Sequence, residues 1–153
     1  MKNDLILKQA ISIIDNKVPL VSNLSNVSSI LNEMDNINWV GFYLVGKDYL
    51  YLGPFQGSSA CTIIPFDKGV CGKSAYHKET IIVEDVNKFE GHIACSSTTK
   101  SEIVVPIIKD DIVYGVIDID SEIYSGFDQN DANILKKVAD ILANLFYENN
   151  KSK

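Results

Sequence analysis

The sequence predicts an α+β fold, with a central antiparallel sheet that carries helices on one face. Two observations predict it: apolar residues recur at helical spacing near both ends of the chain, and short runs rich in β-branched and aromatic residues lie between them. The 153 residues, 46% hydrophobic and 22% charged, suit a single globular domain over residues 1–153. We expect a ligand pocket under loops on the other face, and a frayed tail at 147–153.

The helices are predicted from spacing and capping. Residues 4–15 form the first helix, with apolar side chains at helical intervals, and a second helical stretch covers roughly 23–35. Asp128 can cap the last helix. One apolar stripe should bury this helix against the sheet, and it consists of Leu135, Val138, Ile141, Leu142 and Leu145.

The strands are predicted from composition and turns. "WVGFYLV" (39–45) and "YLYLGPF" (49–55) flank a Gly-Lys-Asp turn, which indicates a hairpin. Later runs also read as strands, with a tight Lys-Asp-Asp turn at 109–111 between the last two: "TIIPF", "TIIVED", "EIVVPII" and "IVYGVIDID".

Charge and hydropathy exclude several classes of function. The net charge is −6 and no Lys/Arg cluster occurs, so we expect no nucleic-acid binding and no binding to anionic membranes. No apolar run reaches the roughly 18 residues that a membrane span needs. Asp4, Lys8 and Asp15 interrupt the N-terminal stretch, which therefore does not resemble a signal peptide. A cytoplasmic location is expected.

Three cysteines, Cys61, Cys71 and Cys95, lie at intervals of 10 and 24 residues. A reducing cytosol disfavours a disulfide framework, and an odd number leaves one thiol over. Each thiol could simply pack as a small hydrophobic group. The flanks "GVCGK" and "HIACSS" are typical of loops, however, whereas Cys61 begins a strand and suits packing better.

Two other roles for these thiols are less well supported. Structural zinc sites usually pair their ligands at Cys-x-x-Cys spacing, which is absent, so we expect no metal. A nucleophilic Cys–His dyad could use His92 or His77, but no residue is evident that would orient the histidine. Each histidine fits better as solvated or hydrogen-bonded to a loop carbonyl.

The carboxylates of "VIDIDS" give a stronger signal. Asp118 and Asp120 alternate on one strand, so both point to one face, while Ile117 and Ile119 point to the other. Glu102 belongs to the neighbouring strand and follows Cys95 by seven residues. A solvated sheet face is one interpretation. The other is a pocket in which like charges raise the pKa of one acid and keep it protonated.

Trp39 and Tyr43 share strand parity. They suit the core, but they could also form the wall of a pocket for an apolar or cationic group.

With these segments in view, the chain resembles the free methionine-(R)-sulfoxide reductases, single-domain proteins of GAF fold. The similarity covers roughly residues 5–147 and includes "NWVGFYL", "GPFQG", "ACTIIPFDKGVCG", "GHIACSSTTKSEIVVPI" and "GVIDIDS". GAF domains in general do not carry the three cysteines at these intervals. Ser96 stands where family members often have an acidic residue.

The resemblance implies roles for the residues singled out above. Cys95 would attack the sulfoxide sulfur, Cys71 would be the main resolving thiol and Cys61 an additional one. Glu102, Asp118 and Asp120 would surround the substrate, with Glu102 and Asp120 also in the chemistry. Trp39 and Tyr43 would form its aromatic wall.

The implied activity is thiol-dependent reduction of free methionine-R-sulfoxide, without a cofactor, in a protein that thioredoxin or a similar dithiol recycles. A homodimer agrees with the apolar stripes of the terminal helices. Two alternatives remain: a non-catalytic GAF-type sensor of a small ligand or of redox state, and a dimerisation module with incidental thiols. An output domain, which sensors usually carry, does not fit in 153 residues.

Overall fold

The computed structural model describes residues 2–93 and 98–151. It contains a six-stranded antiparallel sheet with the strand order β3-β2-β1-β6-β5-β4. The elements, in chain order, are α1 (Lys2–Ile13), α2 (Leu20–Leu31), β1 (Ile37–Val45), β2 (Tyr49–Gly57), β3 (Ile63–Pro65), α3 (Gly69–His77), β4 (Ile81–Val83), the short 3₁₀-helix η1 (Val86–Lys88), β5 (Ser101–Lys109), β6 (Ile112–Ser121) and α4 (Gln129–Lys151).

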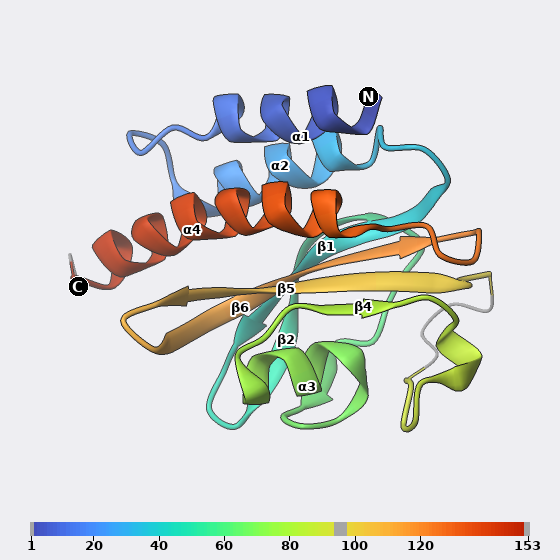
Figure 1. Cartoon of the computed structure of the whole chain (residues 1–153). Helices are drawn as coiled ribbons and strands as arrows, with labels where there is room; N and C mark the ends of the chain where they lie inside the picture. The colour runs from blue at the N-terminus through green and yellow to red at the C-terminus, as the bar shows by residue number, and fades with distance from the viewer. Residues whose placement is uncertain (1, 94–97, 152–153) are drawn as a thin grey trace.

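Three helices cover one face of the sheet. Figure 1 shows α1, α2 and α4 as a layer above the strands, with α4 running across β5 and β6. The larger hydrophobic core lies between this layer and the sheet, and it includes Leu7, Leu24, Leu135, Ile117 and Ile119. The predicted α+β class and the helical face are therefore confirmed.

The opposite face carries a smaller hydrophobic core and, in addition to loops, a helix. α3 lies below the sheet in Figure 1, on the side away from the other helices. We expected a loop around "GVCGK", but Gly69 to His77 form this helix. Gly72 permits the close packing, since a Cβ there would meet Pro65 O at 2.5 Å.

The C-terminal helix is longer than expected. Asp128 caps it, as predicted: Asp131 N donates to Asp128 Oδ1 at 2.9 Å, and Asp128 N donates to Asp131 Oδ2 at 3.0 Å. Near its end, Phe146 stacks on Tyr114 and Lys109 lies over the ring of Tyr147. These contacts fix the helix to the β5–β6 hairpin, so it continues to Lys151 instead of fraying from 147.

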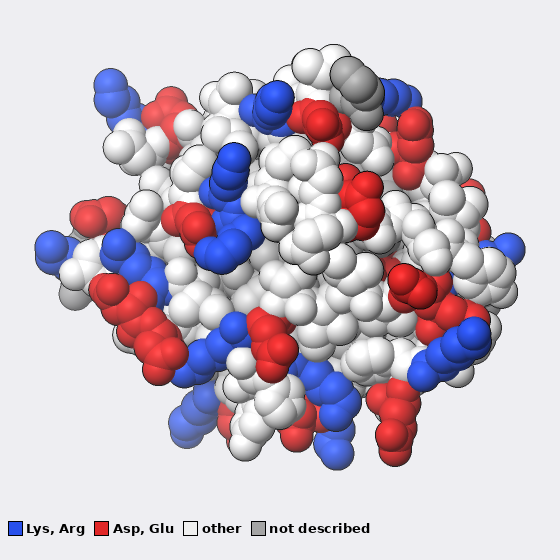
Figure 2. All heavy atoms as spheres, in the orientation of Figure 1, with Lys and Arg blue, Asp and Glu red and all other residues white. Residues whose placement is uncertain are grey.

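Charged side chains are spread over the surface. Figure 2 shows acidic and basic groups interspersed on one face, with no concentrated basic patch. Within the described part of the chain, no helix is both long enough and apolar enough to cross a bilayer.

Candidate active site

Three carboxyl groups lie on the α3 side of the sheet, at its centre. Glu102 on β5 pairs directly with Asp120 on β6, and Asp118 lies two residues further along β6. Glu102 and Asp118 are only 6% and 5% exposed. Ile117 and Ile119 point into the larger core, as the alternation predicted. Burial excludes the solvated sheet face, because ionised carboxylates would be hydrated there.

These acids share protons. Their carboxyl groups hydrogen-bond to one another, and burial, followed by the charges of the neighbouring acids, raises the pKa of Glu102, Asp118 and Asp120 well above the ordinary carboxyl range. At neutral pH the cluster therefore retains at least one proton. Among the described atoms, Asp118 Oδ1 and Asp120 Oδ1 are buried without a hydrogen-bond partner. Such oxygens are available to a ligand.

An aromatic wall stands beside the acids. Trp39 stacks on Phe55 and on Tyr43, with ring centroids 5.4 and 5.9 Å apart. Gly41 lies between Trp39 and Tyr43 on β1, and a Cβ there would meet the Trp39 ring at 2.8 Å. The missing side chain thus leaves room for the indole.

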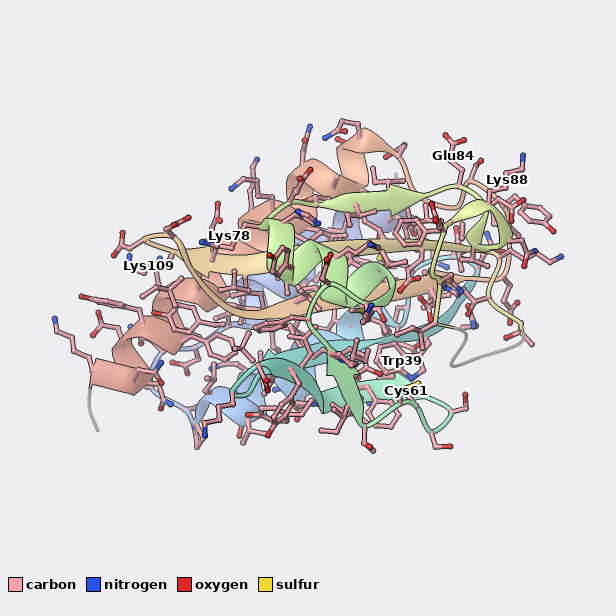
Figure 3. The ribbon with its side chains drawn as sticks, turned by 90° about the horizontal axis from the view of Figure 1, so that it is seen from below. Trp39, Cys61, Lys78, Glu84, Lys88 and Lys109 are labelled. Carbon is pink, nitrogen blue, oxygen red and sulfur yellow. The ribbon has the colours of Figure 1, made fainter. Side chains whose placement is uncertain are left out.

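The polar tips of the wall are fixed to the segment that follows β2. Trp39 Nε1 donates to Ser58 O at 3.0 Å, and the Tyr43 hydroxyl donates to Cys61 O at 2.8 Å. Cys61 packs against the smaller core, which includes Trp39, and Figure 3 labels both residues in the same part of the view. The aromatic residues therefore place one of the three cysteines at the edge of the site.

The cysteines differ in their surroundings. Cys71 lies in the first turn of α3, is 5% exposed, and is a free thiol that hydrogen-bonds to Asp118. Burial, together with the neighbouring carboxyl groups, raises the pKa of this thiol well above its usual value, so it stays neutral. Cys61 is disulfide-bonded. Cys95, which we expect to be the nucleophile, lies outside the described residues.

His92 also contacts the acids, which we did not expect. Its Nε2 lies 3.3 Å from Glu102 Oε1, and burial lowers the pKa of the imidazole. We expected a solvated ring or a bond to a loop carbonyl. His77 does lie at the surface, 3.2 Å from Asp67.

Sequence reasoning also missed a hydrogen-bonded chain leading to Asp120. Asn38 Nδ2 donates to Thr99 Oγ1 at 2.9 Å, and the Thr99 hydroxyl hydrogen-bonds to Asp120, which opposes the rise in its pKa. The one signal was the Ser/Thr run just before β5.

A single cavity connects these groups. The cavity is small, with a free volume of about 30 Å³. Its lining includes every described residue of the predicted site except Cys61, and also Ile64, Lys68, Gly69, Val70, His92, Ile93 and Thr99. Cys71 Sγ and one oxygen each of Glu102 and Asp118 lie within 4.8 Å of one another, a spacing that suits a small cationic group.

Comparison with known proteins agrees with this geometry. Residues 20–146 match the GAF domain family. The chain is 52% identical over 137 residues to the free methionine-R-sulfoxide reductase of Saccharomyces cerevisiae, which covers 84% of this chain and 76% of the yeast enzyme. It is 43% identical to the Escherichia coli enzyme of the same name, covering 77% and 72% of the two chains.

The fold matches a solved enzyme equally well. The free methionine-R-sulfoxide reductase of Neisseria meningitidis, solved in complex with its substrate, superimposes with a TM-score of 0.89 at 43% identity, covering 97% of this chain and 90% of that one. The chain belongs to the free methionine-R-sulfoxide reductases, a family built on the GAF domain.

Proposed function

We propose that this protein reduces free L-methionine-(R)-sulfoxide to L-methionine by thiol chemistry. The observation that carries the proposal is the buried acid cluster, which faces an aromatic wall and two cysteine-bearing segments across one small cavity. A sensor would need ligand-binding groups only. A protonated acid beside thiols is what reduction of a sulfoxide requires, because the sulfoxide oxygen leaves poorly until it is protonated.

The proposed reaction begins with attack by the Cys95 thiolate on the sulfoxide sulfur. Glu102 or Asp120, in its protonated form, delivers a proton to the sulfoxide oxygen as the S–O bond breaks. The S–S bond formed by the attack then breaks as the hydroxyl oxygen transfers to the Cys95 sulfur, which becomes a sulfenic acid, and methionine leaves. The two electrons that reduce the substrate come from the Cys95 sulfur.

A second thiol then condenses with the sulfenic acid and water is released. Two features support Cys61 as the main resolving thiol, the reverse of the order that the resemblance implied. Cys61 is disulfide-bonded, and the buried Cys71 thiol has a raised pKa that suppresses the reactive thiolate. Cys71 instead keeps Asp118 hydrogen-bonded.

The pocket offers a place for each part of the substrate. The methyl and methylene groups lie against Trp39 and Tyr43. The α-ammonium binds between Asp118 and the remaining ionised acid. The α-carboxylate binds at the N-terminus of α3, where Gly69 and Val70 line the cavity and no side chain caps the helix. Both charged ends are then enclosed, which excludes a peptide-bound residue.

The cycle needs an external dithiol and no cofactor. We infer that a thioredoxin-like protein reduces the disulfide by exchange, as a reducing cytoplasm allows. We also infer a homodimer through the α1–α2 layer, whose outer surface exposes Leu5, Ile13 and Val21. Sedimentation velocity tests this assembly.

A coupled assay tests the function. Thioredoxin, its reductase and NADPH are combined with the protein and with free methionine-R-sulfoxide, the free S epimer or a peptide-bound sulfoxide. We expect NADPH consumption with the free R epimer alone. A binding protein without catalysis, the sensor alternative, would consume none with any of the three.

A further inference from the structure

His92 is a titratable group of the cavity that the proposed reaction does not yet use. The sequence contains two histidines, and they occupy different places. His77 is exposed at the end of α3, whereas His92 lines the cavity and contacts Glu102. His92 and Glu102 lie between the cavity and solvent: the His92 side chain is 15% exposed, and that of Glu102 is 7% exposed.

The backbone fixes His92 in this place. Its N–H donates to Phe89 O at 3.2 Å, across a turn in which Gly91 has φ +78°. Phe89 packs on the smaller core. Val86 N in turn donates to Lys100 O at 2.9 Å, next to the start of β5. The turn therefore presents the imidazole to the strand that carries Glu102.

The proposed chemistry consumes a proton from a buried acid. Glu102 must regain that proton before the next sulfoxide can be reduced. The other titratable groups lining the cavity are Tyr43, Lys68, Cys71, Asp118 and Asp120. Tyr43, Cys71 and Asp118 are at least as buried as Glu102, which leaves His92, in direct contact with Glu102, as the group best placed to bring it a proton.

We propose that His92 is a proton relay that reprotonates Glu102 from solvent after each turnover, an inference that rests on the proposed function. The imidazole takes one proton from water at Nδ1 and passes one from Nε2 to Glu102 Oε1, so its charge is unchanged overall, and proton exchange with water restores the starting tautomer. One proton enters for each one delivered to the sulfoxide oxygen, and the proton that Cys95 loses on ionising is released to solvent. The relay moves no electrons.

The state of the ring suits this role. Burial lowers the pKa of His92, so the imidazole is neutral at neutral pH and can both accept and donate. Glu102, whose pKa is raised, begins each cycle protonated. The first turnover therefore needs no relay, and later turnovers do.

The test compares His92→Gln with His77→Gln, the matched control at the surface. Each variant is mixed with excess free methionine-R-sulfoxide and a small-molecule dithiol, and methionine is followed over time at several pH values. For His92→Gln we expect a first turnover of wild-type size and rate, followed by turnover slowed about 10- to 100-fold. Added imidazole should restore the later phase, and the slowing should deepen as pH rises because solvent protons become scarcer. His77→Gln should behave as wild type.

Three results would overturn the relay. The slow phase could be absent, it could be insensitive to imidazole and pH, or the first turnover could fall together with substrate affinity, which would make His92 a structural support. Circular dichroism of each variant identifies misfolding, in which case His92→Asn repeats the comparison. If the wild type itself forms no methionine, the proposed function fails instead.

Discussion

At the scale of single residues, the surroundings of Cys71 raise the pKa of its thiol. Burial is the main cause, and the negative charge of the neighbouring carboxyl groups adds to it, because both oppose a negative charge on the sulfur. Cys71 therefore suits a hydrogen-bond donor to Asp118 better than a nucleophile. Cys61, held at the edge of the site by Tyr43, is not subject to the same burial.

Serine variants of the two thiols should separate these roles. Cys61→Ser and Cys71→Ser should each release about one methionine per chain in the absence of reductant, because resolution follows the reductive step. With thioredoxin, Cys61→Ser should lose most of its turnover and Cys71→Ser should keep most of it. The opposite ranking would restore Cys71 as the main resolving thiol.

The acids should divide between chemistry and affinity. Glu102→Gln and Asp120→Asn remove a transferable proton, so the reductive step should slow about 10²- to 10⁴-fold. Asp118→Asn should mainly weaken substrate binding. Single-turnover rates at a range of sulfoxide concentrations separate the two effects.

The pH dependence of the wild-type rate has a defined sign. The donating acid works only while protonated, and its pKa is raised, so the single-turnover rate should fall as pH rises through that raised value. The variant that lacks the donor should lose this descending limb. Unchanged profiles in both Glu102→Gln and Asp120→Asn would show that neither acid donates.

At the scale of elements, the sequence predicted the sheet well and one helix badly. Period-two alternation and tight turns gave the hairpins, and strand parity placed Asp118 and Asp120 together. The glycines at 69 and 72 led us to predict a loop where the structure has α3, because glycine has a low helix propensity and is common in turns. Here both are buried by tertiary packing, and Gly72 lies against the backbone near Pro65.

Contacts between distant segments could not be predicted in this way. His92 reaches Glu102 and Asn38 reaches Thr99 through loop geometry, which has no periodic signature. The sequence predicted Trp39 and Tyr43 as the aromatic wall. It did not predict Phe55, which stacks on Trp39 because β2 lies beside β1.

The packing of α3 gives a test at this scale. Gly72→Ala places a methyl group against Pro65 O, so the helix must move or the variant must unfold more easily. We expect a loss of about 1 to 3 kcal/mol in the free energy of unfolding and a higher KM for the sulfoxide. Lys73→Ala, one residue along the same helix, should change neither the free energy of unfolding nor the KM. Chemical denaturation and steady-state kinetics measure the two quantities.

At the scale of the whole molecule, the helical layer supplies stability while the other face carries a destabilising site. Folding brings three carboxyl groups together and raises the pKa of each, so the folded state binds more protons than the unfolded state above about pH 4. The free energy of unfolding therefore falls as pH rises from there toward the raised pKa values.

Removing one of the three acids should recover part of the stability that the cluster loses at higher pH. Asp118→Asn should raise the free energy of unfolding by about 1 to 3 kcal/mol near pH 8, with a smaller gain near pH 5, while it weakens substrate binding. Asp140→Asn, on the exposed side of α4, should show no such dependence. Urea unfolding at both pH values measures the difference in the free energy of unfolding between each variant and the wild type. A variant less stable than wild type at pH 8 would mean that the cluster stabilises the fold.

The central claim concerns chemistry at Cys95, and one measurement tests it most directly. Fully reduced protein is mixed with free methionine-R-sulfoxide without any other reductant, and the methionine formed per chain is quantified for the wild type and for Cys95→Ser. We predict about one methionine per wild-type chain and none from the variant. One methionine per Cys95→Ser chain, or none from the wild type, would contradict the account.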